Sequence, residues 1–277
     1  MEKILVTTDF SSNSKAGIRF AIQLSKQMKV ELTFFHSYYI MKPTSWSDET
    51  FLSYEKKETD KIQKKLELFV SSIYKSIGVS FKNKNCVVSS SIFTESSISE
   101  YAYANNFNFI CMSTRGAGKL KKIFGTNTSN LINNSNVPVI AIPHTYRINK
   151  INNILYACDL RNLESELNKV VAFAKPLKSK VELLHFNSPM ELISETKTIE
   201  TAVKKFSKYK VKLHLENASP VNTLISNIES AIQKSKPSML IMFTQQNRSF
   251  FQKLFLSSKS AEYSFNAKVP ILVFNKI

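Results

Sequence analysis

The chain has 277 residues, 43% of them hydrophobic, which allows one large domain or two ordinary ones and excludes general disorder. Its formal net charge is +17, from 38 lysines and arginines against 21 acidic residues. Because the lysines are dispersed among Glu and Asn and no recognition motif accompanies them, they favour solvated helix faces over a nucleic-acid interface.

The sequence predicts a cytoplasmic protein without a membrane anchor. Residues 1–9 lack the charged region and long apolar core of a secretory signal, and no apolar run approaches the length needed to cross a bilayer. The three cysteines, Cys86, Cys111 and Cys158, are far apart and form no C-x-x-C pair, so we expect buried reduced thiols. The four histidines show no metal-ligand spacing.

Short apolar runs alternate with apolar residues at helical spacing along the first part of the chain. The predicted elements are a strand over 3–8, a helix that residues 11–14 (Ser-Ser-Asn-Ser) can cap and that runs to about 28, a strand over 30–36, a helix over 49–75, a strand around 87–88, a helix over 95–105, and strands over 107–112 and 137–142. Residues 79–81 are the competing choice for the third strand. This alternation predicts a parallel sheet with helices on both faces, where ligands bind at the carboxyl ends of the strands.

The pattern starts again near residue 154. The corresponding elements are a strand over 154–160, a helix through 163–174, a strand over 180–185, a helix over 218–234, and strands over 239–242 and 269–273. Self-similarity at this scale predicts a duplicated domain, with the first copy over 1–146 and the second over 151–277.

A loop with glycines follows the fourth strand. It reads Ser113-Thr114-Arg115-Gly116-Ala117-Gly118-Lys119, and Gly125-Thr126-Asn127-Thr128 precedes the next predicted helix, which Thr126 or Thr128 can cap. Glycines and a helix N-terminus are the parts of a phosphate-binding loop. The spacing matches neither a Walker A loop nor a dinucleotide fingerprint, so an ordinary strand-to-helix turn remains the alternative.

This loop, with the Val-Pro-Val-Ile run at 137–140, resembles the universal stress proteins, whose nucleotide-binding members carry G-x-x-G, nine residues and G-[ST]. Ser113-Thr114-Arg115-Gly116 stands at the first motif and Gly125-Thr126 at the second, with eight residues between Gly116 and Gly125. Taken as two copies, the resemblance covers nearly the whole chain. It implies an α/β fold of two tandem flavodoxin-like (Rossmann-like) domains, each a five-stranded parallel sheet of order 3-2-1-4-5 with helices on both faces.

The resemblance also implies a site in the first copy. In the family, the aspartate that ends strand one and the backbone that ends strand two hold the adenosine, and these are Asp9 and Ser37 here. The residues at the positions that hold ribose and phosphates are Met112, Ser113, Arg115, Gly116, Gly125, Thr126 and Asn127. The implied ligand is ATP or AMP, with or without Mg²⁺, and the implied role is a sensor or regulator in stress response. Asp9 as a helix cap and Arg115 as a solvated side chain are the structural alternatives.

The second copy has no glycine in the corresponding loop, which reads 243–248 and Ser257-Ser258. Side chains there would crowd a phosphate held by the backbone, so we expect this copy to bind nucleotide poorly. The family pairs domains through their last strands, here 138–142 and 270–274, which implies an intramolecular pseudo-dimer and leaves a homodimer open.

Three other functions stay open. Ser113 in place of glycine and the shortened loop favour a nucleotide-free interaction protein that acts as a scaffold. A slow ATP hydrolase is weaker, because no Ser-His-Asp set or paired carboxylates accompany the loop. Nucleic-acid binding through the lysines is the third.

Overall fold

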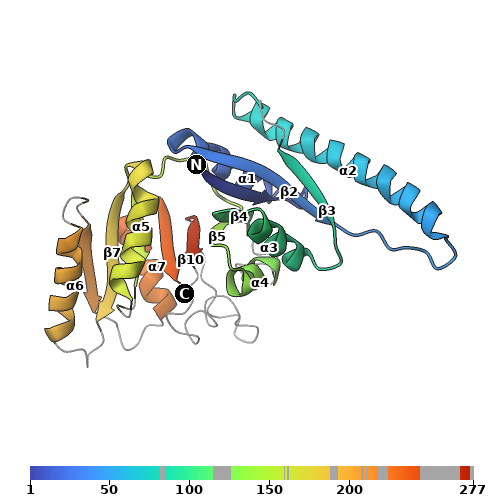
Figure 1. Cartoon of the computed structure of the whole chain (residues 1–277). Coiled ribbons are helices and arrows are strands. Elements are labelled where there is room, and N and C mark those ends of the chain that lie inside the picture. The colour runs from blue at the N-terminus through green and yellow to red at the C-terminus, as the bar shows by residue number, and fades with distance from the viewer. Residues whose placement is uncertain are drawn as a thin grey trace.

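The computed structural model describes residues 1–81, 85–114, 126–158, 160, 162–187, 193–206, 209, 211–217, 224–243 and 269–274. These residues form one ten-stranded sheet with helices packed on both of its faces (Figure 1). No helix in this part of the chain is both long enough and apolar enough to cross a bilayer.

The first half alternates strands and helices as predicted. Its elements are β1 (Glu2–Thr7), α1 (Lys15–Gln27), β2 (Val30–Tyr38), α2 (Asp48–Ser76), β3 (Cys86–Ser90), α3 (Thr94–Ala104), β4 (Phe109–Ser113), α4 (Thr126–Asn134) and β5 (Val139–Ile142). Helix α2 begins after Ser47, whose hydroxyl accepts a hydrogen bond from the Thr50 N–H at 3.2 Å. Such a cap satisfies one of the backbone donors that a helix start leaves without an intrahelical partner.

The second half repeats the pattern with a shorter second helix. Its elements are β6 (Asn153–Ala157), α5 (Leu163–Leu177), β7 (Lys180–Asn187), α6 (Ile193–Lys205), β8 (Lys212–Asn217), α7 (Leu224–Ser235), β9 (Met239–Phe243) and β10 (Ile271–Phe274). Helix α6 and strand β8 were not predicted from the sequence. The predicted start of α7, at 218–220, lies outside the described residues.

The strand order is β3-β2-β1-β4-β5-β10-β9-β6-β7-β8. Each half therefore has the predicted order 3-2-1-4-5, and the pairs within each half are parallel. The halves meet where β5 and β10 pair antiparallel, with Ile140 opposite Leu272. The two sets of strands consequently point in opposite directions across the sheet.

Two apolar cores lie on opposite faces of the sheet. Buried residues of α1, α2, α5 and α6 form one core, and those of α3, α4 and α7 form the other. The stripe predicted for the long second helix supplies Leu66, Val70 and Ile73 to the first core, each at most 2% exposed. Burying apolar surface in this way is the main favourable term in folding.

Three details differ from the sequence reading or decide between its alternatives. The third strand is Cys86–Ser90, not 79–81, where Phe81 instead packs against Phe34 and Tyr74. Strand β2 continues to Tyr38 because Ser37 and Tyr38 pair with β3, so Ser37 lies inside the strand and not after it. Neither Thr126 nor Thr128 precedes α4 as a helix cap does, because α4 begins at Thr126.

Candidate functional site

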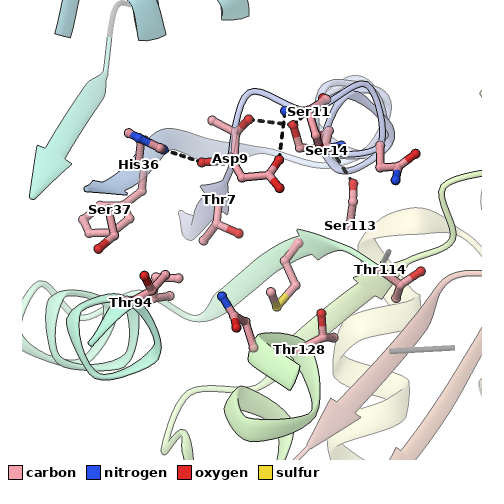
Figure 2. A pocket seen from close by; sticks show the side chains of 16 residues that line it. Thr7, Asp9, Ser11, Ser14, His36, Ser37, Thr94, Ser113, Thr114 and Thr128 are labelled. Atoms are coloured by element: carbon pink, nitrogen blue, oxygen red, sulfur yellow. Dashed lines mark hydrogen bonds between the residues drawn. The ribbon is translucent and has the colours of Figure 1, made fainter. Parts of the chain in front are cut away.

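A cavity of about 190 Å³ lies at the carboxyl edge of the strands of the first half (Figure 2). Its walls come from the ends of β1, β2 and β4 and from the N-terminal parts of α3 and α4. From β1 the chain adds β2 and β3 on one side, and it then returns to add β4 and β5 on the other side of β1. The order of the strands therefore reverses between β1 and β4. Open α/β sheets bind ligands at such points. The volume exceeds the ~150 Å³ of an engineered cavity that holds benzene, which leaves room for a nucleobase-sized group.

Asp9, at the rim of this cavity, is the second residue after β1, and we call the space the Asp9 cavity. Its carboxylate accepts a hydrogen bond from the Ser11 N–H at 2.9 Å. Partial burial alone would raise the pKa of Asp9, but hydrogen bonds from Ser11 and Ser14 outweigh burial and lower the pKa below its usual value. Phe10, with φ of 62°, turns the chain sharply away from the sheet between these residues. The turn thus holds an ionised carboxylate at the mouth of the cavity.

Hydroxyl groups cover much of the cavity wall. Thr8 Oγ1 and Ser14 Oγ lie 2.8 Å apart and hydrogen-bond to each other. The Ser37 Oγ is buried, lines the cavity and has no hydrogen-bond partner among the described residues. Leaving a buried polar group unsatisfied costs about 1–3 kcal/mol, which a polar ligand in the cavity would relieve.

The floor of the cavity is apolar. Phe35, Ile98 and Met112 line it and are 0%, 4% and 7% exposed. An apolar floor beneath a ring of hydroxyls suits a ligand with a flat apolar face and polar edges.

His36 joins the end of β1 to β2. Its Nδ1 lies 2.8 Å from the Thr8 carbonyl oxygen, and because a carbonyl only accepts, Nδ1 carries the proton. Burial lowers the pKa of His36; the Thr8 carbonyl acts in the opposite direction, and the Lys65 ammonium adds to the lowering. The neutral imidazole is therefore a positioning group for the turn that carries Asp9.

Ser113 ends β4, and its side chain is directed to α1 (Figure 2). Its Oγ accepts a hydrogen bond from the Gly17 N–H at 2.6 Å and donates one to the Ser14 carbonyl at 3.3 Å. A Cβ added at Gly17 would lie 3.0 Å from that Oγ and 3.2 Å from the Ser113 nitrogen, so a larger residue at position 17 would require Ser113 to shift by a few tenths of an ångström. The pair holds the start of α1 against the end of β4.

The structure brings together five of the residues proposed from the sequence. The residues that line the Asp9 cavity from this set are Asp9, Ser37, Met112, Ser113 and Asn127. Arg115, Gly116 and Gly125 lie outside the described residues, and Thr126 is placed only as the first residue of α4. Asn127 is exposed in the first turn of α4, whose N-terminus faces the cavity and favours negative charge.

The sequence reading missed several lining residues. Thr94, Thr114 and Thr128 all contribute to the wall. Thr94 could have been found, because it begins the helix after β3 and so lies at the same carboxyl edge as Asp9 and Ser37. Thr114 follows β4, where its hydroxyl donates to the Ile142 carbonyl at 3.2 Å.

The chemistry of the described wall is that of binding. In the part of the chain that the structure places, no cluster of three or more His, Cys, Asp or Glu side chains could hold a metal ion. The cavity combines one ionised carboxylate, a ring of hydroxyls, an apolar floor and helix N-termini. These groups suit a ligand with a flat polar-edged part and a negatively charged part.

Comparison with known proteins gives one family match. The family described as "Universal stress protein family" matches residues 1–143. Comparison with curated proteins gives no match.

Several solved structures share the fold. A universal stress protein from Archaeoglobus fulgidus DSM 4304 has a TM-score of 0.67 and 17% identity, covering 99% of this chain and 98% of that chain. A protein of unknown function from Pseudomonas aeruginosa PAO1 has a TM-score of 0.59 and 15% identity, covering 99% and 92%. The cytoplasmic domain of a prokaryotic cation chloride cotransporter has a TM-score of 0.51 and 10% identity, covering 98% and 94%. At these identities the likeness concerns the fold alone.

Proposed function

Because the chain belongs to the universal stress protein family, we propose that its N-terminal half binds an adenine nucleotide, ATP or AMP, in the Asp9 cavity and that the protein acts as a stress-response regulator. The observation that carries this proposal is the Ser37 hydroxyl, which is buried in the cavity wall without a partner among the described residues. A nucleobase edge supplies the hydrogen-bonding group that this hydroxyl lacks.

The proposed pose follows from the chemistry of the wall. The base lies on the apolar floor of Phe35 and Met112, and the Asp9 carboxylate accepts a hydrogen bond from an amino or ribose hydroxyl group. The phosphates lie toward the start of α4, where backbone N–H groups and the helix dipole favour anions. Mg²⁺, where it accompanies ATP, is bound chiefly by the phosphates, because Asp9 is the one carboxylate among the described lining residues.

One observation favours a nucleotide-free interaction protein instead. The Ser113 hydroxyl occupies the position of the family's first glycine and is already bonded to the backbone of α1 at Gly17 and Ser14. If that hydroxyl occupies the space that a phosphate oxygen needs, the cavity does not bind nucleotide, and Ser113 only holds α1 against β4. A measurement of nucleotide binding distinguishes the two functions.

Calorimetry of the whole chain with ATP and with AMP, each with and without Mg²⁺, tests the proposal. We expect saturable binding that Asp9→Ala weakens at least about tenfold, because a hydrogen bond to a charged group contributes roughly 1.5–3 kcal/mol. The matched control is Asp159→Ala, the corresponding aspartate of the second copy, which should leave binding unchanged. Absence of heat and of a thermal shift at millimolar nucleotide would reject nucleotide binding and leave the scaffold function.

We also propose that the antiparallel join of β5 and β10 acts as an internal version of the family's domain pairing. The support for it is the register, in which Ala141 lies opposite Ile271 and Val139 opposite Val273. A monomer by light scattering would agree with this proposal, whereas an obligate homodimer would require a further interface.

A further inference from the structure

A second cavity, of about 260 Å³, lies at the join between the two halves. Its walls are the starts of β1 and β4, the end of α1, one side of α5 and the end of β10. It opens at the amino ends of β1 and β4, whereas the Asp9 cavity lies at their carboxyl ends. We call this space the Phe109 cavity, after the residue at the start of β4.

The linker between the halves explains why this space is open. The antiparallel join gives α1 and α5 corresponding places on one face of the sheet. Along α1 the linker fills the surface, where the Tyr146 ring packs edge-on against Phe20 at 5.5 Å. Further on, the Gln27 amide accepts from the Ile151 N–H at 2.9 Å and donates to the Ile151 carbonyl at 3.1 Å. Because the linker lies against α1, it does not cover the corresponding surface of α5, where the cavity lies.

Aromatic rings form the middle of the Phe109 cavity. Phe109 packs edge-on against Phe173 at 5.5 Å and against Phe274 at 6.2 Å between ring centroids. These rings are 5–8% exposed, and all three line the cavity. Water in contact with such rings is displaced favourably by an apolar ligand.

Two charged residues of opposite sign line the cavity. Lys169 of α5 is half-buried, its ammonium lies 5.9 Å from the centroid of the Phe243 ring, and it has no anionic partner among the described residues. Glu2 lines the cavity from the start of β1. The lining thus carries one cation beside an aromatic surface, and one carboxylate.

We propose that the Phe109 cavity binds a small monocarboxylate with an apolar body, such as an aryl carboxylate or a medium-chain fatty acid. The carboxylate pairs with Lys169, and the apolar body lies on Phe109 and Phe274. The Glu2 carboxylate disfavours ligands with a second negative charge.

Titration of the whole chain with 2-naphthoate and with decanoate tests this site by calorimetry. We expect one saturable site, and at least tenfold weaker binding of the uncharged 2-naphthylmethanol and of naphthalene-2,6-dicarboxylate. Preference for 2-naphthoate over decanoate would assign an aryl ligand, and the reverse preference an alkyl one. No saturable binding of either monocarboxylate at millimolar concentration overturns the proposal.

Three variants locate the binding. Lys169→Met should weaken 2-naphthoate at least tenfold while leaving 2-naphthylmethanol unchanged. Ala172 is an exposed position of α5 that lines the cavity, so Ala172→Trp should fill the space and abolish binding without unfolding the helix. Lys175→Trp, on an exposed position of α5 outside the lining, is the matched control and should bind normally. Equal binding by the Ala172→Trp and Lys175→Trp proteins would place the ligand elsewhere and overturn the proposal.

Discussion

At the carboxyl edge of the first half, Gly17 of α1 lies against Ser113 of β4, whereas bulky residues occupy the same places in the second half. The strand registers identify the matching positions, because Val6 pairs with Cys111 as Tyr156 pairs with Ile241. Counting on from these pairs, the second-half residues that correspond to Gly17 and Ser113 are Leu167 and Phe243. These two are 0% and 1% exposed, and the Phe243 ring stacks on Phe274 at 5.1 Å.

The backbone at the two edges has stayed alike. A histidine of the second strand hydrogen-bonds through Nδ1 to the carbonyl that follows the first strand, His36 to Thr8 at 2.8 Å and His185 to Cys158 at 3.2 Å. The residue two positions after that carbonyl has a left-handed conformation in both halves: φ is 62° at Phe10 and 65° at Leu160. The turn is thus alike in the two halves although the side chains around it differ.

The described residues show that side-chain size differs between the two edges while the backbone is alike. In the second half, the Tyr156 hydroxyl donates to the carboxylate of Glu166, in the first turn of α5, and both residues are buried. The corresponding first-half residues are the smaller Val6 and Ala16. At these positions larger buried side chains fill the second half, whereas smaller ones lie in the first half.

The largest expected effect is that of giving the first half the second half's side chain at position 17. Gly17→Leu places a Cβ 3.0 Å from the Ser113 Oγ and adds a side chain beyond it. Overpacking of this kind costs about 1–3 kcal/mol, and the displaced end of β4 should weaken ATP binding at least about tenfold. Calorimetry with ATP and urea unfolding measure the two effects.

Two further variants separate the local clash from a general loss of stability. Lys26→Leu, on an exposed position of the same helix, should leave ATP affinity unchanged. Gly17→Ala should weaken ATP binding less than Gly17→Leu, and adding Ser113→Gly should restore it, because the nearest atom to the new Cβ is the Ser113 Oγ. Unchanged ATP affinity in the Gly17→Leu protein would show that the contact between Gly17 and Ser113 does not affect the binding site.

Much of the fold could be predicted from local patterns. Helix α2 and the order of the first five strands follow from helical stripes, short apolar runs and the family resemblance. Strand β8 was missed although Val211, Leu213 and Leu215 alternate with polar residues across it. Six residues are a weak period-two signal, and the pairing with β7 that makes them a strand is not visible in the sequence.

The candidate site could be predicted only in part. Asp9, Ser37 and Ser113 were found because the carboxyl ends of parallel strands share one edge of the sheet. The role of Gly17 was missed because its contact partner is 96 residues away in sequence, and no local pattern marks such an approach. The hydrogen bond from His36 to the Thr8 carbonyl was not predicted, because it depends on side-chain placement that a sequence pattern does not give.

A smaller expected effect is acid sensitivity at the first half's edge. The pKa of His36 is lowered in the folded protein, chiefly by burial, so the unfolded chain takes up a proton before the folded one does. The neutral His36 therefore contributes stability above the unfolded pKa of about 6.5, and this contribution is lost as the pH falls through the lower folded value. Urea unfolding at pH 7, 6 and 5 should show that the free energy of unfolding depends less on pH in the His36→Gln protein than in the wild type. His144→Gln, at an exposed position, should keep the wild-type slope.

The smallest expected effect belongs to the second half, where acid sensitivity should appear at lower pH. Burial alone would raise the pKa of Glu216, but hydrogen bonds from Lys234 at 2.9 Å and His214 at 3.1 Å outweigh it and lower the pKa. The ionised carboxylate thus contributes stability above its unfolded pKa of about 4.5, and the contribution is lost as the pH falls through the folded value.

Because Lys234 is 65% exposed, the pair with Glu216 should contribute no more than about 1 kcal/mol. Glu216→Gln should lower stability slightly at pH 7 and reduce the further loss between pH 5 and 3, as followed by urea unfolding. Glu164→Gln, which breaks a pair exposed on both sides with Lys205, is the control and should change neither. If His36→Gln and Glu216→Gln reduced the pH dependence of the free energy of unfolding over the same pH range, the two halves would not differ in acid sensitivity as we expect.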